Sequence, residues 1–106
     1  MQGIYLKFYV TERAEHQGIL LYEWLLEEAK KLGFSGGTAM RAVAGFGRHG
    51  RLHEETFFEL AGDLPVEVAF ALSEAQADEF LGLLKKENLK LFYIKVPVEY
   101  GILGGL

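Results

Sequence analysis

The sequence predicts one α+β domain in which a four-stranded antiparallel sheet carries two helices on one face. Four segments of the 106-residue chain alternate apolar and polar residues, which is typical of strands. Two other segments repeat apolar residues every three or four positions, which is typical of helices. The elements follow in the order strand, helix, strand, strand, helix, strand. With right-handed crossovers, this order gives the ferredoxin-like βαββαβ sandwich.

The first half of the chain is expected to form a strand, a helix and a second strand. Apolar residues alternate through residues 3–10, so this segment is predicted to be a strand. Residues 16–32 place their apolar side chains on one helical face, and Gly33 suits the left-handed turn that ends many helices. Residues 38–46 are expected to form the second strand. Its side chains predicted to face the helices are those of Met40, Ala42, Ala44 and Phe46.

The second half is expected to form a strand, a helix and an edge strand. Residues 63–65 open the third strand, which continues to Leu72. Ser73 and Gln76 have the spacing of a capping box, which predicts a helix from there to near Asn88. The last strand is expected over residues 91–100. Its side chains predicted to face inward are those of Phe92, Ile94, Val96 and Val98.

The sheet face opposite the helices is expected to be too apolar for a monomer. Aromatic side chains mixed with charges of both signs are typical of an oligomer interface, and the alternative is an amphipathic face that stays in water. Lys7, Arg41 and Lys95 are available to pair with Glu67 and Glu99. The residues predicted on this face are Tyr5, Lys7, Tyr9, Arg41, Val43, Glu67, Ala69, Ala71, Tyr93 and Lys95.

The composition excludes several classes of function. A formal net charge of −4 argues against nucleic acid as the main partner, because phosphate binding needs a concentrated positive field. The chain has no cysteine, which excludes disulfides and thiolate chemistry. No signal peptide or membrane-spanning stretch is recognisable, so we expect a cytoplasmic protein that is not embedded in a membrane. We expect residues 1–100 to form the domain and residues 101–106 to form a flexible tail.

The segment "AGFGRHGRLHEE", residues 44–55, lies between the second and third predicted strands. Its glycines allow the backbone N–H groups to form an anion-binding nest, and its arginines carry forked donors that match phosphate or carboxylate. The alternative is a flexible basic loop without a ligand. Arg41, at the base, is either a ligand contact or a partner in an interface salt bridge. The candidate ligand-binding residues are Arg41, Gly45, Phe46, Gly47, Arg48, His49, Arg51 and His53.

The same segment offers weaker metal and catalytic interpretations. His49 and His53 are four residues apart and could bind a divalent metal together with Glu54, Glu55 or His16. Glycine disfavours a helix there, the arginines repel a cation, and a closed zinc site needs four ligands, so no metal is expected. The spacing of residues indicates no Ser-His-Asp triad or pair of catalytic carboxylates. We therefore expect a protein that is not an enzyme and has no cofactor.

Three blocks of sequence resemble the PII-like family known as Domain of Unknown Function family 190. They are "HQGILLYEWL" at residues 16–25, "RAVAGFGRHGRLH" at residues 41–53 and "DLPVEV" at residues 63–68. The resemblance implies a ferredoxin-like homotrimer in which the loop between strands two and three, the T-loop, responds to ligands and docks on partners. It implies small anionic ligands, often adenine nucleotides, in the clefts between subunits, and membrane transporters as partners.

From this resemblance we expect a non-catalytic signalling protein. Binding of a small anionic metabolite, such as an adenine nucleotide, would order the loop from Gly45 to Glu55 and so regulate a partner such as a membrane transporter. The alternative is a divalent-metal-binding protein similar to CutA, using His49 and His53.

Overall fold

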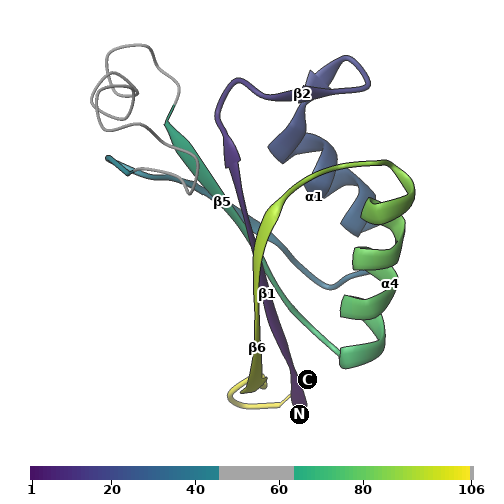
Figure 1. Cartoon of the computed structure of the whole chain (residues 1–106). Coiled ribbons are helices and arrows are strands. Elements are labelled where there is room, and N and C mark those ends of the chain that lie inside the picture. The colour runs from purple at the N-terminus through teal and green to yellow at the C-terminus, as the bar shows by residue number, and fades with distance from the viewer. Residues whose placement is uncertain (46–63, 106) are drawn as a thin grey trace.

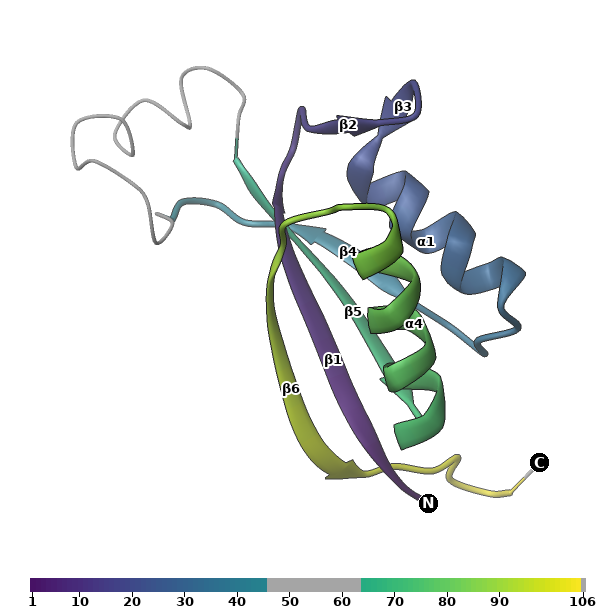
Figure 2. The ribbon, with the colours of Figure 1, turned by 45° about the vertical axis from the view of Figure 1, so that its right-hand side comes forward.

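The computed structural model describes residues 1–45 and 64–105 and has the predicted ferredoxin-like fold (Figure 1). The strands of its main sheet lie in the order β4-β5-β1-β6, and each is antiparallel to its neighbours. Both helices lie on the same side of this sheet (Figure 2). The elements of the two layers are β1 (Gln2–Thr11), α1 (Leu21–Lys31), β4 (Thr38–Arg41), β5 (Pro65–Leu72), α4 (Glu74–Lys86) and β6 (Phe92–Glu99).

Residues 16–20 correct the predicted start of the first helix. They belong to a small hairpin of β2 (Glu15–His16) and β3 (Ile19–Leu20), and helix α1 begins only at Leu21. Gln17 and Gly18 have φ angles of 53° and 84°. Positive φ at both central residues is the geometry of a two-residue hairpin turn, and it is incompatible with a continuing right-handed helix.

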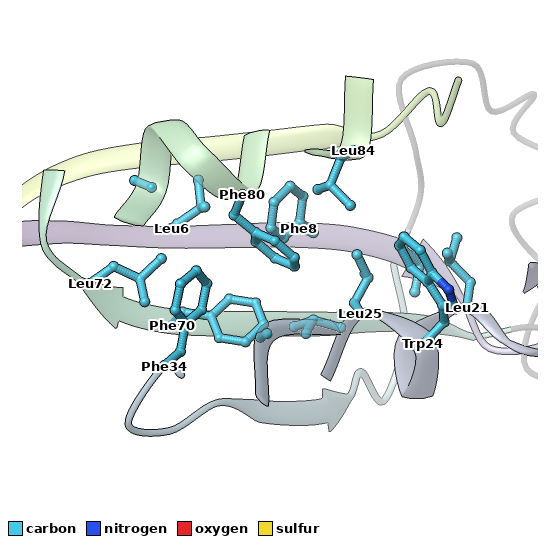
Figure 3. Packing of buried hydrophobic residues seen from close by; sticks show 14 of the residues in the cluster. Leu6, Phe8, Leu21, Trp24, Leu25, Phe34, Phe70, Leu72, Phe80 and Leu84 are labelled. Atoms are coloured by element: carbon cyan, nitrogen blue, oxygen red, sulfur yellow. The ribbon is translucent and has the colours of Figure 1, made fainter. Parts of the chain in front are cut away.

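The hydrophobic core lies between the sheet and the helices, as the alternation in β1 and β5 predicts. Phe8, Phe34, Phe70 and Phe80 gather at its centre (Figure 3). Phe80 of α4 meets the rings of Phe8, Phe34 and Phe70 edge-on, with centroid distances of 5.8, 5.4 and 5.4 Å. Aromatic pairs favour this arrangement, so Phe80 is the residue that joins the helix to both central strands.

The capping box at the start of α4 is confirmed. The Gln76 N–H donates to Ser73 Oγ at 3.1 Å, and the Ser73 N–H donates to Gln76 Oε1 at 3.0 Å. The helix ends before Asn88, whose φ of 61° places it in the left-handed region. The predicted flexible tail, residues 101–106, stays a prediction.

We expect Ser73→Ala to lower the free energy of unfolding by about 1 kcal/mol, because the Gln76 N–H at the first turn of α4 loses its acceptor. Urea denaturation followed by circular dichroism measures this loss. The matched control is Ser35→Ala, at the chain's other serine, which is exposed and should change stability by less than about 0.5 kcal/mol. Equal stability of the two variants would show that the cap contributes nothing.

The orientation predicted for the last strand was wrong. The register pairs Tyr93 with Phe8 and Lys95 with Leu6, so these two residues lie on the helix side of the sheet. The Tyr93 ring packs against Phe8 at 6.3 Å, and Lys95 Nζ reaches Asp78 Oδ1 of α4 at 3.3 Å. The alternate set therefore faces away from the helices. It consists of Phe92, Ile94, Val96 and Val98.

The orientation predicted for β4 was also wrong. Met40 pairs with Glu67 and lies on the side away from the helices, whereas Ala39 pairs with Val68 and packs against the core. Arg41 consequently lies on the helix side, and Val43 lies beyond the end of the strand. In β4 both sides carry apolar residues, Ala39 on one and Met40 on the other, so alternation alone could not show which set is buried.

Candidate functional site

An exposed apolar surface covers the sheet face that the helices leave open. We call it the open face. Ile94, Val96 and Phe92 of β6 are 37%, 40% and 44% exposed, and Met40 of β4 is 64% exposed. Exposed apolar side chains gathered on one face of a sheet are typical of an interaction surface. The residues of the open face are Tyr5, Lys7, Tyr9, Met40, Glu67, Ala69, Ala71, Phe92, Ile94 and Val96.

The centre of the open face carries one ion pair. Lys7 Nζ lies 2.8 Å from Glu67 Oε1, as the sequence suggested, and 5.6 and 5.8 Å from the ring centroids of Tyr5 and Tyr9. The hydrogen bond to Glu67 raises the pKa of Lys7 above its ordinary value of 10.5, so Lys7 is charged at neutral pH. The two charges compensate each other, which reduces the free-energy cost of covering this face.

A hollow of about 440 Å³ lies over β5 on the open face. Ala69 and Ala71 line it, and Tyr5, Met40 and Glu67 contribute longer side chains to it. One end is formed by the segment 35–38, where two glycines leave the space free of side chains. A side chain on Gly37 would come within 2.4 Å of the Phe70 ring, so only glycine lets this segment pass so close to the core.

The two described ends of the β4–β5 connection are tied together. The Ala42 N–H donates to the Pro65 carbonyl at 2.8 Å, and the Glu12 N–H donates to the Leu64 carbonyl at 2.8 Å. The Arg41 guanidinium forms an ion pair with the Glu12 carboxylate, which links β4 to the end of β1. Arg41 therefore lies at the base of the candidate ligand-binding loop, as predicted, but its partner is Glu12 and not Glu67 or Glu99.

Most of the predicted ligand-binding residues belong to the part of the chain between residues 46 and 63, outside the described ranges. Arg41 and Gly45 belong to the described part of the chain, and Gly45 is exposed beside Pro65. The anion nest and the histidine metal site both stay predictions. The residues that lie outside the described ranges are Phe46, Gly47, Arg48, His49, Arg51 and His53.

His16, the third histidine considered for a metal site, has a different role in the fold. Its Nε2 lies 2.9 Å from Glu87 Oε1, and Gln17 Nε2 donates to the same oxygen at 2.9 Å. Its ring meets Trp24 edge-on at 4.5 Å, so His16 fastens the β2–β3 hairpin to the end of α4. Within residues 1–45 and 64–105, no three His, Asp or Glu side chains are grouped to hold a metal ion.

Sequence reasoning missed Glu12, which belongs to none of the predicted elements. Its side chain meets Arg41 only because β1 and β4 lie on either side of β5, a relation that depends on the sheet order.

Among the described helices, none combines the length and the hydrophobicity needed to span a bilayer.

Comparison with known proteins gives consistent similarities in sequence and fold. The model of the DUF190 family, described as "Uncharacterized ACR, COG1993", matches residues 3–94. A UPF0166 protein of Aquifex aeolicus is 31% identical over 97 residues, which cover 84% of this chain and 92% of the relative. A UPF0166 protein of Methanocaldococcus jannaschii is 34% identical over 61 residues, covering 58% and 56% of the two chains.

One solved structure has a similar fold. It is a crystal structure of a protein from Thermus thermophilus that is named as a PII-like signaling protein, and it superposes with a TM-score of 0.56. The similarity covers 92% of this chain and 89% of the other, at 21% sequence identity.

Proposed function

Because this chain belongs to the DUF190 family and has a PII-like fold, we propose that it is a non-catalytic regulatory protein of the cytoplasm. In this proposal the chain forms a homotrimer through its open face. It senses a small anionic metabolite, such as an adenine nucleotide, at the base of the β4–β5 loop. The loop then transmits the state of the site to a partner protein, for which a membrane transporter is the proposed class.

The position of Arg41 carries the ligand part of the proposal. Its guanidinium is paired with Glu12, next to the two hydrogen bonds that hold both ends of the β4–β5 connection. Arginine presents several donors in a plane that fits phosphate and carboxylate groups. An anion bound at Arg41 competes with the Glu12 carboxylate for these donors. The ligand therefore binds more tightly when Arg41 is released from Glu12 than when the two residues are paired. A ligand-driven switch requires such a difference in affinity between two states.

We expect at least one anion among ATP, ADP, AMP and bicarbonate to raise the melting temperature of the wild-type protein. Arg41→Gln should lower the affinity for that ligand by about ten-fold or more, because a charge-assisted hydrogen bond is lost. Isothermal titration calorimetry gives the affinities. The control is Arg13→Gln, which makes the same change of net charge at an arginine outside the β4–β5 connection.

Three results would contradict the ligand part of this proposal. In the first, none of these anions stabilises the protein. In the second, both arginine variants lose affinity equally, which indicates a general effect of charge. In the third, only divalent metals stabilise the protein, and the effect disappears in a His49→Ala, His53→Ala double variant. That last result would favour the CutA-like alternative.

A further inference from the structure

We propose that the β2–β3 hairpin is an autoinhibitory latch, which keeps Glu12 paired with Arg41 and so lowers the affinity of Arg41 for anions. The contact of His16 with Glu87 holds the latch closed. This inference rests on the proposed function, because it concerns the regulation of the same anion site. It gives His16 and Glu87 a positioning role, in which they act on the ligand only through Glu12.

Glu12 lies between the end of β1 and the hairpin, which continues into α1 (Figure 2). The Ala14 N–H donates to the Thr11 carbonyl at 3.2 Å and closes a turn around Glu12. The Leu21 N–H donates to the Ala14 carbonyl at 2.7 Å, where the two ends of the hairpin meet. Only two residues separate Glu12 from β2, so a displacement of the hairpin is carried over this short distance to Glu12.

Side chains fasten the hairpin to the rest of the fold. Its strands contain only two residues each, and a two-stranded hairpin is marginally stable without further contacts. Glu87 Oε1, at the end of α4, lies 2.9 Å from His16 Nε2 and accepts a hydrogen bond from Gln17 Nε2 at 2.9 Å. The His16 ring also meets Trp24 of α1 edge-on at 4.5 Å. One carboxylate oxygen therefore holds two successive residues of the hairpin, and hydrogen bonds to a charged acceptor are the stronger kind.

A fastened hairpin disfavours anion binding at Arg41. The chain keeps the Glu12 carboxylate beside the guanidinium at a high effective concentration, and an anion from solution has to displace it. Displacement leaves Glu12, whose side chain is only 20% exposed, without its ion-pair partner, which costs free energy. A loosened hairpin lowers the effective concentration of Glu12 and lets its carboxylate move into water. Both changes raise the affinity for the anion.

The test is a gain of affinity, which a merely destabilising substitution would not produce. The ligands are ATP, ADP, AMP and bicarbonate, and isothermal titration calorimetry measures their affinities. His16→Ala should bind the anion that stabilises the wild type about five-fold more tightly, because a hydrogen bond of the latch is lost. His16→Gln, which keeps a nitrogen donor, should lie between the wild type and His16→Ala.

A second variant removes the other side of the contact. Glu87→Gln should also raise the affinity for the anion, because the charged acceptor shared by His16 and Gln17 is lost. The matched control is Glu28→Gln, which makes the same change of net charge and breaks the Lys31–Glu28 ion pair of α1. This control should leave the affinity unchanged. Circular dichroism confirms that each variant is folded.

A double-mutant cycle shows whether the latch acts through Glu12. Glu12→Gln alone should raise the affinity for the anion, because the competing carboxylate is removed. Adding His16→Ala to Glu12→Gln should change the affinity no further, since residues that act through one contact are not additive.

The fluorescence of Trp24, the single tryptophan of the chain, gives an independent readout of the hairpin. Anion binding to the wild type should change this emission as the His16 ring moves away from the indole. The change should be absent in His16→Ala, although that variant binds the anion more tightly.

The outcomes separate this inference from the proposed function. Unchanged or weaker binding by folded His16→Ala and Glu87→Gln overturns the latch, while the anion site at Arg41 stands. A gain from His16→Ala that persists in the Glu12→Gln background also overturns it, because the hairpin then acts by another route. If neither the wild type nor Glu12→Gln binds any of these anions, the ligand part of the proposed function fails, and the latch fails with it.

Discussion

Ile94→Asp is expected to convert the protein from an oligomer to a monomer. Ile94 lies in the middle of β6 on the open face, directly opposite Lys7, whose ion pair with Glu67 lies at the centre of that face. An aspartate there would lie beside Lys7, whose charge Glu67 already compensates, so one negative charge would be buried in the interface without compensation. Such a penalty amounts to several kcal/mol, and about 4 kcal/mol corresponds to a weakening of nearly a thousand-fold.

Size-exclusion chromatography with light scattering measures the change directly. The wild type should have three times the protomer mass of 11.9 kDa, and Ile94→Asp should have the protomer mass at micromolar concentration. The matched control is Ile102→Asp, the same substitution at a more exposed isoleucine that follows β6 and lies outside the sheet. If Ile94→Asp keeps the mass of the wild type, the open face is not the interface.

The sequence predicts the two central strands better than the two edge strands, for a physical reason. In β1 and β5 the side buried beneath the helices is uniformly apolar, and the other side carries tyrosines, charges and alanines. In β6 the side predicted to face the helices is the more hydrophobic one, yet it faces away from them. Tyr93 is 46% exposed there, and the Lys95 ammonium pairs with Asp78 of α4, so both long side chains fit at an edge that the helices cover incompletely.

The error in β6 carries functional information. A strand whose more hydrophobic side lies on the open face departs from the usual burial pattern, and such local inconsistencies are expected at functional surfaces. The first helix shows a different limit. Its apolar repeat extends back to Ile19, but Gln17 and Gly18 adopt positive φ and form a turn. The periodicity of side chains does not show where positive φ angles keep the backbone from being helical.

The candidate site, like the fold, could be predicted from the sequence only in part. The position of Arg41 at the base of the β4–β5 connection follows from the order of the elements. Its pairing with Glu12 depends on β4 and β1 lying on opposite sides of β5, which no local pattern encodes. The hollow likewise depends on strand register, because the register brings Met40, Glu67 and Tyr5 to the same side of the sheet.

Phe80→Ala is expected to cause the largest loss of stability of any change considered. The ring of Phe80 is fully buried and meets three other phenylalanine rings edge-on. Replacing a buried phenylalanine with alanine costs about 3–5 kcal/mol, from lost burial and from the cavity that remains. We expect the upper part of this range, because Phe8, Phe34 and Phe70 come from three different segments and cannot close the cavity together.

Urea denaturation at a fixed protomer concentration measures this loss, because the proposed self-association would make stability depend on concentration. Glu79→Ala, at the adjacent exposed position of α4, is the control and should change stability by less than about 0.5 kcal/mol. Phe80→Leu should cost less than Phe80→Ala, because the leucine side chain fills more of the cavity. A loss below about 2 kcal/mol for Phe80→Ala would contradict the role of Phe80, since the smallest losses at well-packed sites exceed it. Helix α4 would then depend mainly on its other buried residues, Ala77 and Leu84.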